Sequence, residues 1–213
     1  MEIKINETEA RVLGSLIEKE LTTPDYYPLS LNALTNACNQ KSNRHPVVSY
    51  TEDEVGDTLA GLIEKGLVQR SNVARVTKYE ERLTVDRKLV AREASVLCVL
   101  LLRGPQTIGE LRGRTARMYP FESLEDVHET LDGLAEWGWI ERLPRMPGQK
   151  EARYTHLFCG RPDSPEGQVE PAAVSSPDDT EARLANIEEA IENLRNDLDA
   201  LKQAFKDFTD QFK

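Results

Sequence analysis

A short polar stretch in the first third of the chain carries several groups that hydrogen-bond to anions. Gln40, Lys41, Asn43 and Arg44 lie together, and His45 follows them. Ammonium, guanidinium and amide groups make most protein contacts to the nucleic-acid backbone, because they donate to phosphate oxygens. The stretch is therefore a candidate contact with nucleic acid. A rigid pocket formed by the same side chains would also accept an anionic effector.

Basic residues recur later in the chain, on two expected β-hairpins and on one expected helix with the turn that follows it. Each is a candidate phosphate contact, and the alternative is that each is an ordinary solvated surface charge. The further candidates are Arg70, Arg75, Lys78, Arg112, Arg114, Arg117, Arg145 and Lys150.

The residues that usually hold metals or perform catalysis show no such pattern. The three histidines and three cysteines are widely separated, and no Cys-X-X-Cys pair occurs. A glycine-rich phosphate loop and a Gly-X-Ser-X-Gly motif are also missing from the sequence. We therefore expect a non-enzymatic protein without a cofactor or a metal.

Cysteine usage and hydropathy bear on the compartment. An odd number of widely spaced cysteines is typical of reduced cytoplasmic thiols. The first ten residues lack the basic and apolar regions of a signal peptide. The longest strongly apolar run, Val96–Leu102, spans seven residues, whereas a membrane span needs about 20. We expect a cytoplasmic protein with no membrane partner.

The chain contains two copies of one module. Residues 51–70 and 123–142 are identical at eight of twenty aligned positions. Residues 9–16 and 28–34 are echoed in the same order at 93–100 and 105–111. Three segments that recur in order indicate a duplication, and a period of roughly 75 residues is too long for a solenoid.

Each copy is expected to fold as three helices followed by a two-stranded hairpin. Asn6 with Glu9, and Thr51 with Glu54, have the spacing of capping boxes that begin helices. Gly66 is the expected left-handed end of the third helix of the first copy. The helix at 89–103 is apolar almost all round, so we expect it to be buried between the copies and to join them into one body.

Three helices and a hairpin form the winged-helix arrangement, in which the third helix usually enters the major groove. Both third helices are acidic here: residues 51–65 contain five acidic residues against Lys65 alone, and residues 123–137 contain five and no Lys or Arg. Their carboxylates would repel phosphates. We therefore expect nucleic acid to be approached through the basic loop and the hairpins, or the protein to be an adaptor that binds only other proteins.

The chain also resembles a family of bacterial proteins, the YceH-like proteins. The resemblance is carried by residues 22–49, with the stretch Asn39–Arg44 as its most specific part, by residues 62–68 with 76–82, and by residues 92–115. It covers roughly residues 3–160. The resemblance implies a tandem winged-helix fold and implies no particular activity.

Acidity and apolar periodicity distinguish the last quarter of the chain. Of the net charge of −10, residues 1–160 contribute little, with 21 Lys and Arg against 24 Asp and Glu. Four prolines mark residues 161–177 as a flexible linker, and apolar residues alternate three and four apart after it. The expected coiled-coil positions are Leu184, Ile187, Ile191, Leu194, Leu198, Leu201, Phe205, Phe208 and Phe212.

This apolar stripe needs a partner surface. Self-association into a homo-oligomer is the simplest solution, and folding back onto the body is the alternative; light scattering on a chain that ends at residue 176 distinguishes the two. We therefore predict a mainly α fold with small β-hairpins (α+β). Its parts are two winged-helix domains (1–85 and 86–160), the linker (161–177) and a coiled-coil helix (178–213). DNA and a protein partner are the two candidate ligands.

Overall fold

Local capping interactions begin most of the long helices where the sequence predicts. In the computed structural model, which describes residues 3–71, 76–145 and 151–161, α1 (Glu7–Thr22) begins with a complete capping box. Asn6 Oδ1 accepts from the Glu9 amide at 2.8 Å, and Glu9 Oε2 accepts from the Asn6 amide at 2.8 Å. These paired bonds satisfy amide groups that a helix start otherwise leaves open.

The first repeat follows the expected order. After α1 come a 3-10 turn η1 (Pro24–Tyr26), α2 (Leu31–Cys38) and α3 (Glu52–Glu64), which has its own Thr51–Glu54 capping box. Gly66 follows α3 with a φ of +71°, as predicted for a helix end. The hairpin of β2 (Val68–Ser71) and β3 (Lys78–Glu81) then forms, and a two-residue strand β1 (Leu29–Ser30) adds to β3 in the order β1-β3-β2.

The second repeat has the same order of elements. A short helix, α4 (Leu83–Arg87), leads into α5 (Ala91–Arg103), α6 (Ile108–Thr115) and α7 (Leu124–Glu136). Strands β4 (Ile140–Arg142) and β5 (Tyr154–His156) then pair antiparallel. The predicted α+β class with small hairpins is confirmed. The strand β1 and the helix α4 were not predicted.

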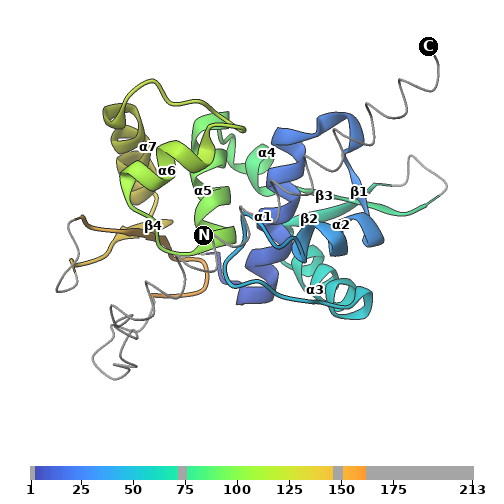
Figure 1. Ribbon diagram of the computed structural model, residues 1–213. Helices are drawn as coiled ribbons and strands as arrows, with labels where there is room; N and C mark the ends of the chain where they lie inside the picture. The colour runs from blue at the N-terminus through green and yellow to red at the C-terminus, as the bar shows by residue number, and fades with distance from the viewer. Residues whose placement is uncertain (1–2, 72–75, 146–150, 162–213) are drawn as a thin grey trace, which may run out of the picture. The chain divides into compact units, whose positions relative to one another are not determined.

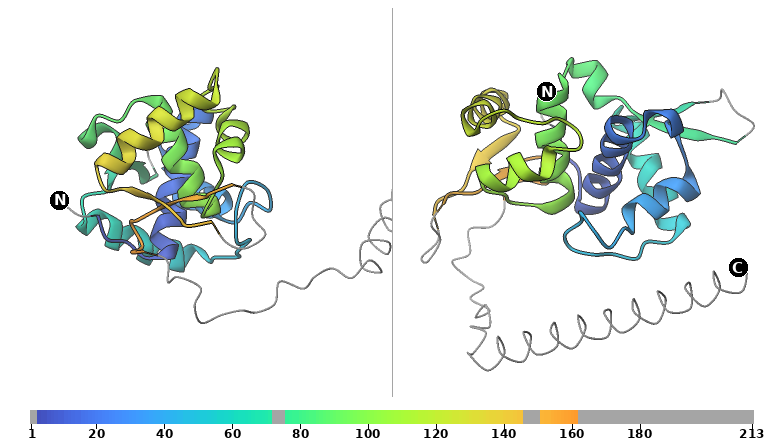
Figure 2. Two further views of the ribbon diagram at one scale, coloured as in Figure 1. Left: turned by 90° about the vertical axis from the view of Figure 1, so that its left-hand side faces the viewer. Right: turned by 45° about the horizontal axis from the view of Figure 1, so that its top comes forward.

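The core is built where the first helices of the two repeats meet. Every residue of α1 from Glu9 to Ile17 is buried, and so is every residue of α5 from Ala94 to Leu102. The two helices lie side by side (Figure 2) and pack against each other. The expected burial of the 89–103 helix is therefore confirmed, and the described residues fall within one compact unit, Met1–Pro162.

The two hairpins leave this unit in opposite directions. Figure 1 shows β2 and β3 at one end and β4 at the other, with α1 and α5 between them. The predicted linker continues beyond Arg161, and that part, with the coiled-coil positions Leu184–Phe212, lies outside the described residues; self-association therefore stays a prediction. In the described part of the chain, no helix combines the length and the apolar character needed to cross a membrane.

Candidate functional site

A cavity of about 560 Å³ opens where the two repeats meet. Its walls come from the end of α1, the loop after α2, the C-terminal half of α5, and the end of α6 with the turn that follows it. This arrangement brings two predicted clusters together, since the 39–45 loop supplies Gln40, Lys41 and Asn43 while α6 and its following turn supply Arg114 and Arg117.

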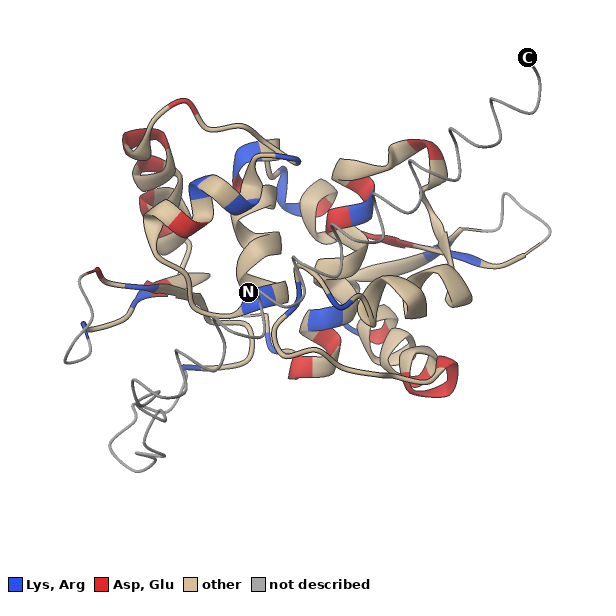
Figure 3. Ribbon diagram, viewed as in Figure 1, with Lys and Arg blue, Asp and Glu red and all other residues tan. Residues whose placement is uncertain are grey.

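Positive charge dominates the lining. Five cationic side chains face the cavity, and Glu18 is the one carboxylate among its described lining residues. The five are Lys19, Lys41, Arg103, Arg114 and Arg117. Figure 3 shows basic positions gathered on α6, whereas α7 and the start of α3 are acidic.

The five cations differ in how far they are already paired. Lys19 Nζ lies 3.4 Å from Glu18 and Arg114 Nη2 lies 3.4 Å from Glu110. Arg103 donates to the side-chain oxygen of Asn43. Within the described ranges, Lys41 and Arg117 form no hydrogen bond or ion pair, and both are exposed. These two side chains are thus the most available to an anion.

Glu18, the carboxylate in the lining, is neutralised by the buried side chain of Arg44. Arg44 Nη2 lies 2.6 Å from Glu18 Oε2, and Nη1 lies 3.0 Å from Oε1. Burial by itself would raise the pKa of Glu18, but the hydrogen bonds and the charge of Arg44, together with Lys19, lower it. Glu18 therefore stays ionised, and its charge is balanced within the protein.

Arg44 itself requires a correction to the predicted set of contacts. Its side chain is 0% exposed, and its guanidinium donates to Glu18 and to the carbonyl of Ala37. A guanidinium with its donors committed inside the protein is not available to a phosphate. Arg44 is a structural residue of the loop, and we leave it out of the candidate interface.

The loop that carries Lys41 is held at several points. The Asn39 amide group bonds both backbone groups of Tyr50, at 2.7 and 2.8 Å. Arg11 donates to the carbonyls of Cys38 at 3.2 Å and Pro46 at 2.6 Å, and the His45 amide donates to Leu102 O at 2.9 Å. Lys41 therefore projects from a loop of fixed shape.

The remaining predicted contacts lie elsewhere. Arg112 donates to the carbonyls of Phe121 and Glu122, at 3.4 and 2.8 Å, which fixes it against its own repeat. Arg70 and Lys78 lie on the first hairpin, and Arg145 follows β4 on the second. Arg75 and Lys150 lie outside the described residues. Because the hairpins point apart (Figure 1), their cations do not join the cavity in one patch.

Two cavity residues, Lys19 and Arg103, were not among the predicted contacts. Each occupies the last turn of a helix, where a basic side chain commonly interacts with the helix dipole. That ordinary position gave no signal that they face a shared cavity. The acidic third helices do turn their charges outward: Glu52, Asp53 and Glu54 on α3 are exposed.

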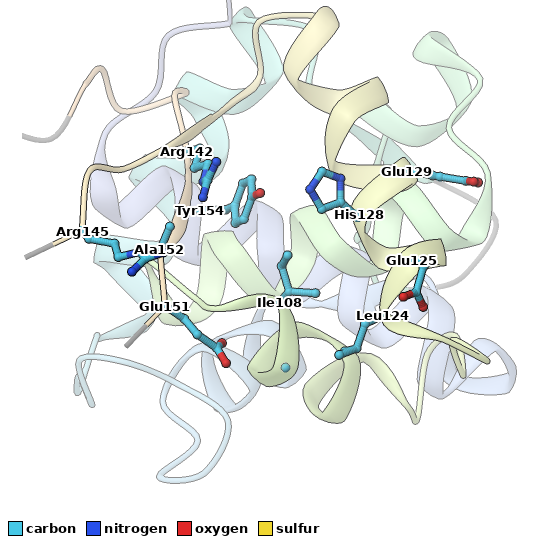
Figure 4. A pocket seen from close by; sticks show the side chains of 11 residues that line it. Ile108, Leu124, Glu125, His128, Glu129, Arg142, Arg145, Glu151, Ala152 and Tyr154 are labelled. Atoms are coloured by element: carbon cyan, nitrogen blue, oxygen red, sulfur yellow. The ribbon is translucent and has the colours of Figure 1, made fainter. Parts of the chain in front are cut away.

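A second hollow, also of about 560 Å³, lies between α6, α7 and the β4–β5 hairpin. Figure 4 shows His128 and Tyr154 facing each other across it. Three carboxylates and two guanidiniums line this hollow, so it favours neither anions nor cations. The five charged residues are Glu125, Glu129, Glu151, Arg142 and Arg145. We find no chemical preference in this hollow.

The described residues do not assemble a metal centre or an activated thiol. Among them, no group of three or more His, Cys, Asp or Glu side chains is placed to hold a metal ion. Cys38 and Cys98 are buried, and burial raises the pKa of both thiols. Neither has the thiolate character of a nucleophile.

A cluster of carboxyl groups joins the end of α1 to β3. Burial, a hydrogen bond with Glu81 and the charges of Glu81 and Glu80 raise the pKa of Glu20 to about 8 from its ordinary 4.5. Glu81 is itself buried, accepts from the Thr84 amide at 3.0 Å, and its amide donates to the Tyr27 hydroxyl oxygen at 2.6 Å. Burial and the neighbouring carboxylates therefore favour the protonated form of Glu20, which hydrogen-bonds Glu81.

We expect Glu20→Gln to remove a pH dependence of stability. A pKa raised on folding gives stability that is complete below the ordinary carboxyl pKa and is lost as pH rises through about 8. The amide keeps a neutral donor at every pH, so at pH 9 the variant should be more stable by about 1–2 kcal/mol, a modest value because solvent reaches Glu20. Urea unfolding at pH 5, 7 and 9 tests this, and parallel pH curves for the two proteins would contradict it.

Comparison with known proteins gives relatives across the whole chain. Residues 5–149 match the family model described as "Protein of unknown function, DUF480". A UPF0502 protein of Solibacter usitatus is 48% identical over the full length of both chains. UPF0502 protein Acid345_3645 of Koribacter versatilis is 52% identical over 91% of this chain and 92% of its own, and UPF0502 protein VPA1223 of Vibrio parahaemolyticus is 46% identical over 95% and 96%.

Proposed function

This chain belongs to the family described as protein of unknown function DUF480, an uncharacterised bacterial family as the sequence predicted, and from that premise we propose that it is a non-enzymatic tandem winged-helix protein that binds the phosphate backbone of nucleic acid. The proposed contacts are the loop 39–43 and the end of α6, with the hairpins as secondary contacts.

The winged-helix part of the proposal is supported by the order of elements. In each repeat, three helices precede an antiparallel hairpin, and the first hairpin is joined by a short strand between the first two helices. In winged-helix and related proteins, the helix before the recognition helix crosses the backbone and contacts phosphates. α6 holds that place in the second repeat and carries Arg114.

The observation that carries the nucleic-acid proposal is the meeting of Lys41 and Arg117 at one opening. They come from different repeats, both are exposed, and Arg103 and Arg114 lie beside them in the same lining. The exposed carboxylates of α3 and α7 would repel a phosphate. A nucleic-acid backbone is therefore expected to contact the side of the protein that carries the cavity. Contacts of this type recognise the backbone rather than a base sequence.

Binding to a random-sequence duplex should therefore weaken steeply with salt. Each phosphate contact contributes about −0.9 to the slope of log affinity against log salt, so Lys41→Ala with Arg117→Ala should flatten the slope by about 2. Fluorescence anisotropy with the full chain from low to physiological salt measures this.

Arg87→Ala with Arg92→Ala is the matched control, because it removes two exposed charges that lie outside the cavity. The control should keep the slope of the unchanged protein. No detectable binding at low salt would overturn the proposal and would favour a protein adaptor whose acidic α3 and α7 surfaces meet a basic partner.

A further inference from the structure

The cavity between the repeats has the dimensions of a small-molecule site. Its volume of about 560 Å³ lies inside the range of about 300–1,000 Å³ typical of such sites. The side chains of Val99, Leu102 and Met118 give it an apolar wall, while Gln40 and Ser42 add polar groups at its rim. A nucleic-acid backbone running over the surface would use the rim and leave this interior volume unused.

The charges of the lining are incompletely balanced. Burial, and after it the repulsion from the nearby charges of Arg114 and Arg44, lower the pKa of Arg103, and the smaller opposite effects of Glu18 and Glu110 do not offset them. Glu18, the carboxylate of the lining, is already paired with Arg44 at 2.6 Å. A bound anion would relieve this repulsion, whereas a neutral ligand would not.

The amount of charge indicates more than one phosphate group. A phosphate ester carries about −1.5 to −2 charges near pH 7. Lys19 and Arg114 each lie 3.4 Å from a carboxylate, so three lining cations, Lys41, Arg103 and Arg117, have none among the described residues. One phosphate group would still leave at least one of these three without a counter-charge. Two adjacent phosphates come closer to balance with Lys41, Arg103 and Arg117, which line the same cavity.

The cavity is also held in shape before any ligand arrives. Asn43 adopts a left-handed backbone conformation with a φ of +61°, and its side chain accepts from Arg103 across the opening. The buried Arg44 and the Asn39–Tyr50 bonds fix the loop on either side of it. A site that is already ordered loses little conformational entropy when a ligand binds, so less of the binding free energy is offset.

We propose that this cavity binds a small molecule of nucleotide size that carries two or more adjacent phosphate groups. Lys41 and Arg117 are its main phosphate contacts, and the apolar wall receives the rest of the molecule. This goes beyond the proposed function, because it requires no nucleic acid; a ligand held here would compete with a duplex for the same two side chains.

Isothermal titration of the full chain at constant ionic strength tests the proposal, with inorganic pyrophosphate, ATP and adenosine as probes. Pyrophosphate and ATP should bind and adenosine should not. Because ATP carries a third phosphate, ADP is titrated beside it as the match for pyrophosphate. Equal affinities for pyrophosphate and ADP would assign recognition to the diphosphate alone, and tighter binding of ADP than of pyrophosphate would show that the apolar wall contributes.

Lys41→Ala with Arg117→Ala should weaken binding of the phosphate probes at least tenfold, and Arg87→Ala with Arg92→Ala should leave it unchanged. No heat with any phosphate probe at millimolar concentration, or equal losses in the two variants, would overturn the inference. Duplex binding without pyrophosphate or ATP binding would remove this inference alone, and the reverse result would remove only the nucleic-acid proposal.

Discussion

Replacing Arg44 with alanine is expected to lower the free energy of unfolding by about 3–5 kcal/mol, the usual cost of removing one partner of a buried ion pair. The arginine side chain is 0% exposed and that of Glu18 is 12% exposed. Without Arg44, only Lys19 at 3.4 Å would face the carboxylate. The Ala37 carbonyl would also lose donors at 3.0 and 3.1 Å. Urea unfolding of the full chain measures the difference.

Two companion variants separate this cost from a general effect of charge. Lys41→Ala removes an exposed neighbour in the same loop and should change stability by no more than about 0.5 kcal/mol. Arg44→Lys keeps the charge, but one ammonium cannot reproduce the forked bonds to Glu18 and Ala37, so it should remain destabilising. An Arg44→Ala protein as stable as Lys41→Ala would contradict the structural role.

Local signals in the sequence were enough to place most of the elements. A capping box needs only residues three apart, so Asn6 with Glu9 and Thr51 with Glu54 indicated helix starts without any knowledge of the tertiary fold. The strand β1 could not be found this way. It has two residues, and it exists because Leu29 pairs with Tyr79 far along the chain.

The functional surface was less accessible from the sequence than the fold. Lys41 and Arg44 are nearly adjacent and look alike as loop cations, yet one is exposed and the other is buried against Glu18 of α1. The duplication revealed two modules but not which of their faces would meet. The packing of α1 on α5 decides that, and it brings Lys41 and Arg117 to one cavity.

The contact between α1 and α5 depends on the absence of a side chain at Gly14. A Cβ there would lie 3.0 Å from Leu102 Cγ and 3.1 Å from Leu101 Cβ. The leucine tip can rotate away, but the Leu101 Cβ is fixed to the backbone of α5, so the helices would have to separate. We expect Gly14→Ala to lower the free energy of unfolding by about 1–3 kcal/mol, as overpacked cores do.

Gly56→Ala, which makes the same change within α3, is expected instead to raise the free energy of unfolding. A Cβ at Gly56 would have no neighbour within 4 Å, and alanine favours a helix over glycine by about 1 kcal/mol. Both variants gain that helix preference, so the difference between them measures the cost of the α1–α5 contact alone. Because this contact also shapes the cavity, Gly14→Ala should weaken pyrophosphate binding while Gly56→Ala leaves it intact. Equal stability of the two variants would show that the repeats separate at little cost and that the cavity does not depend on their close packing.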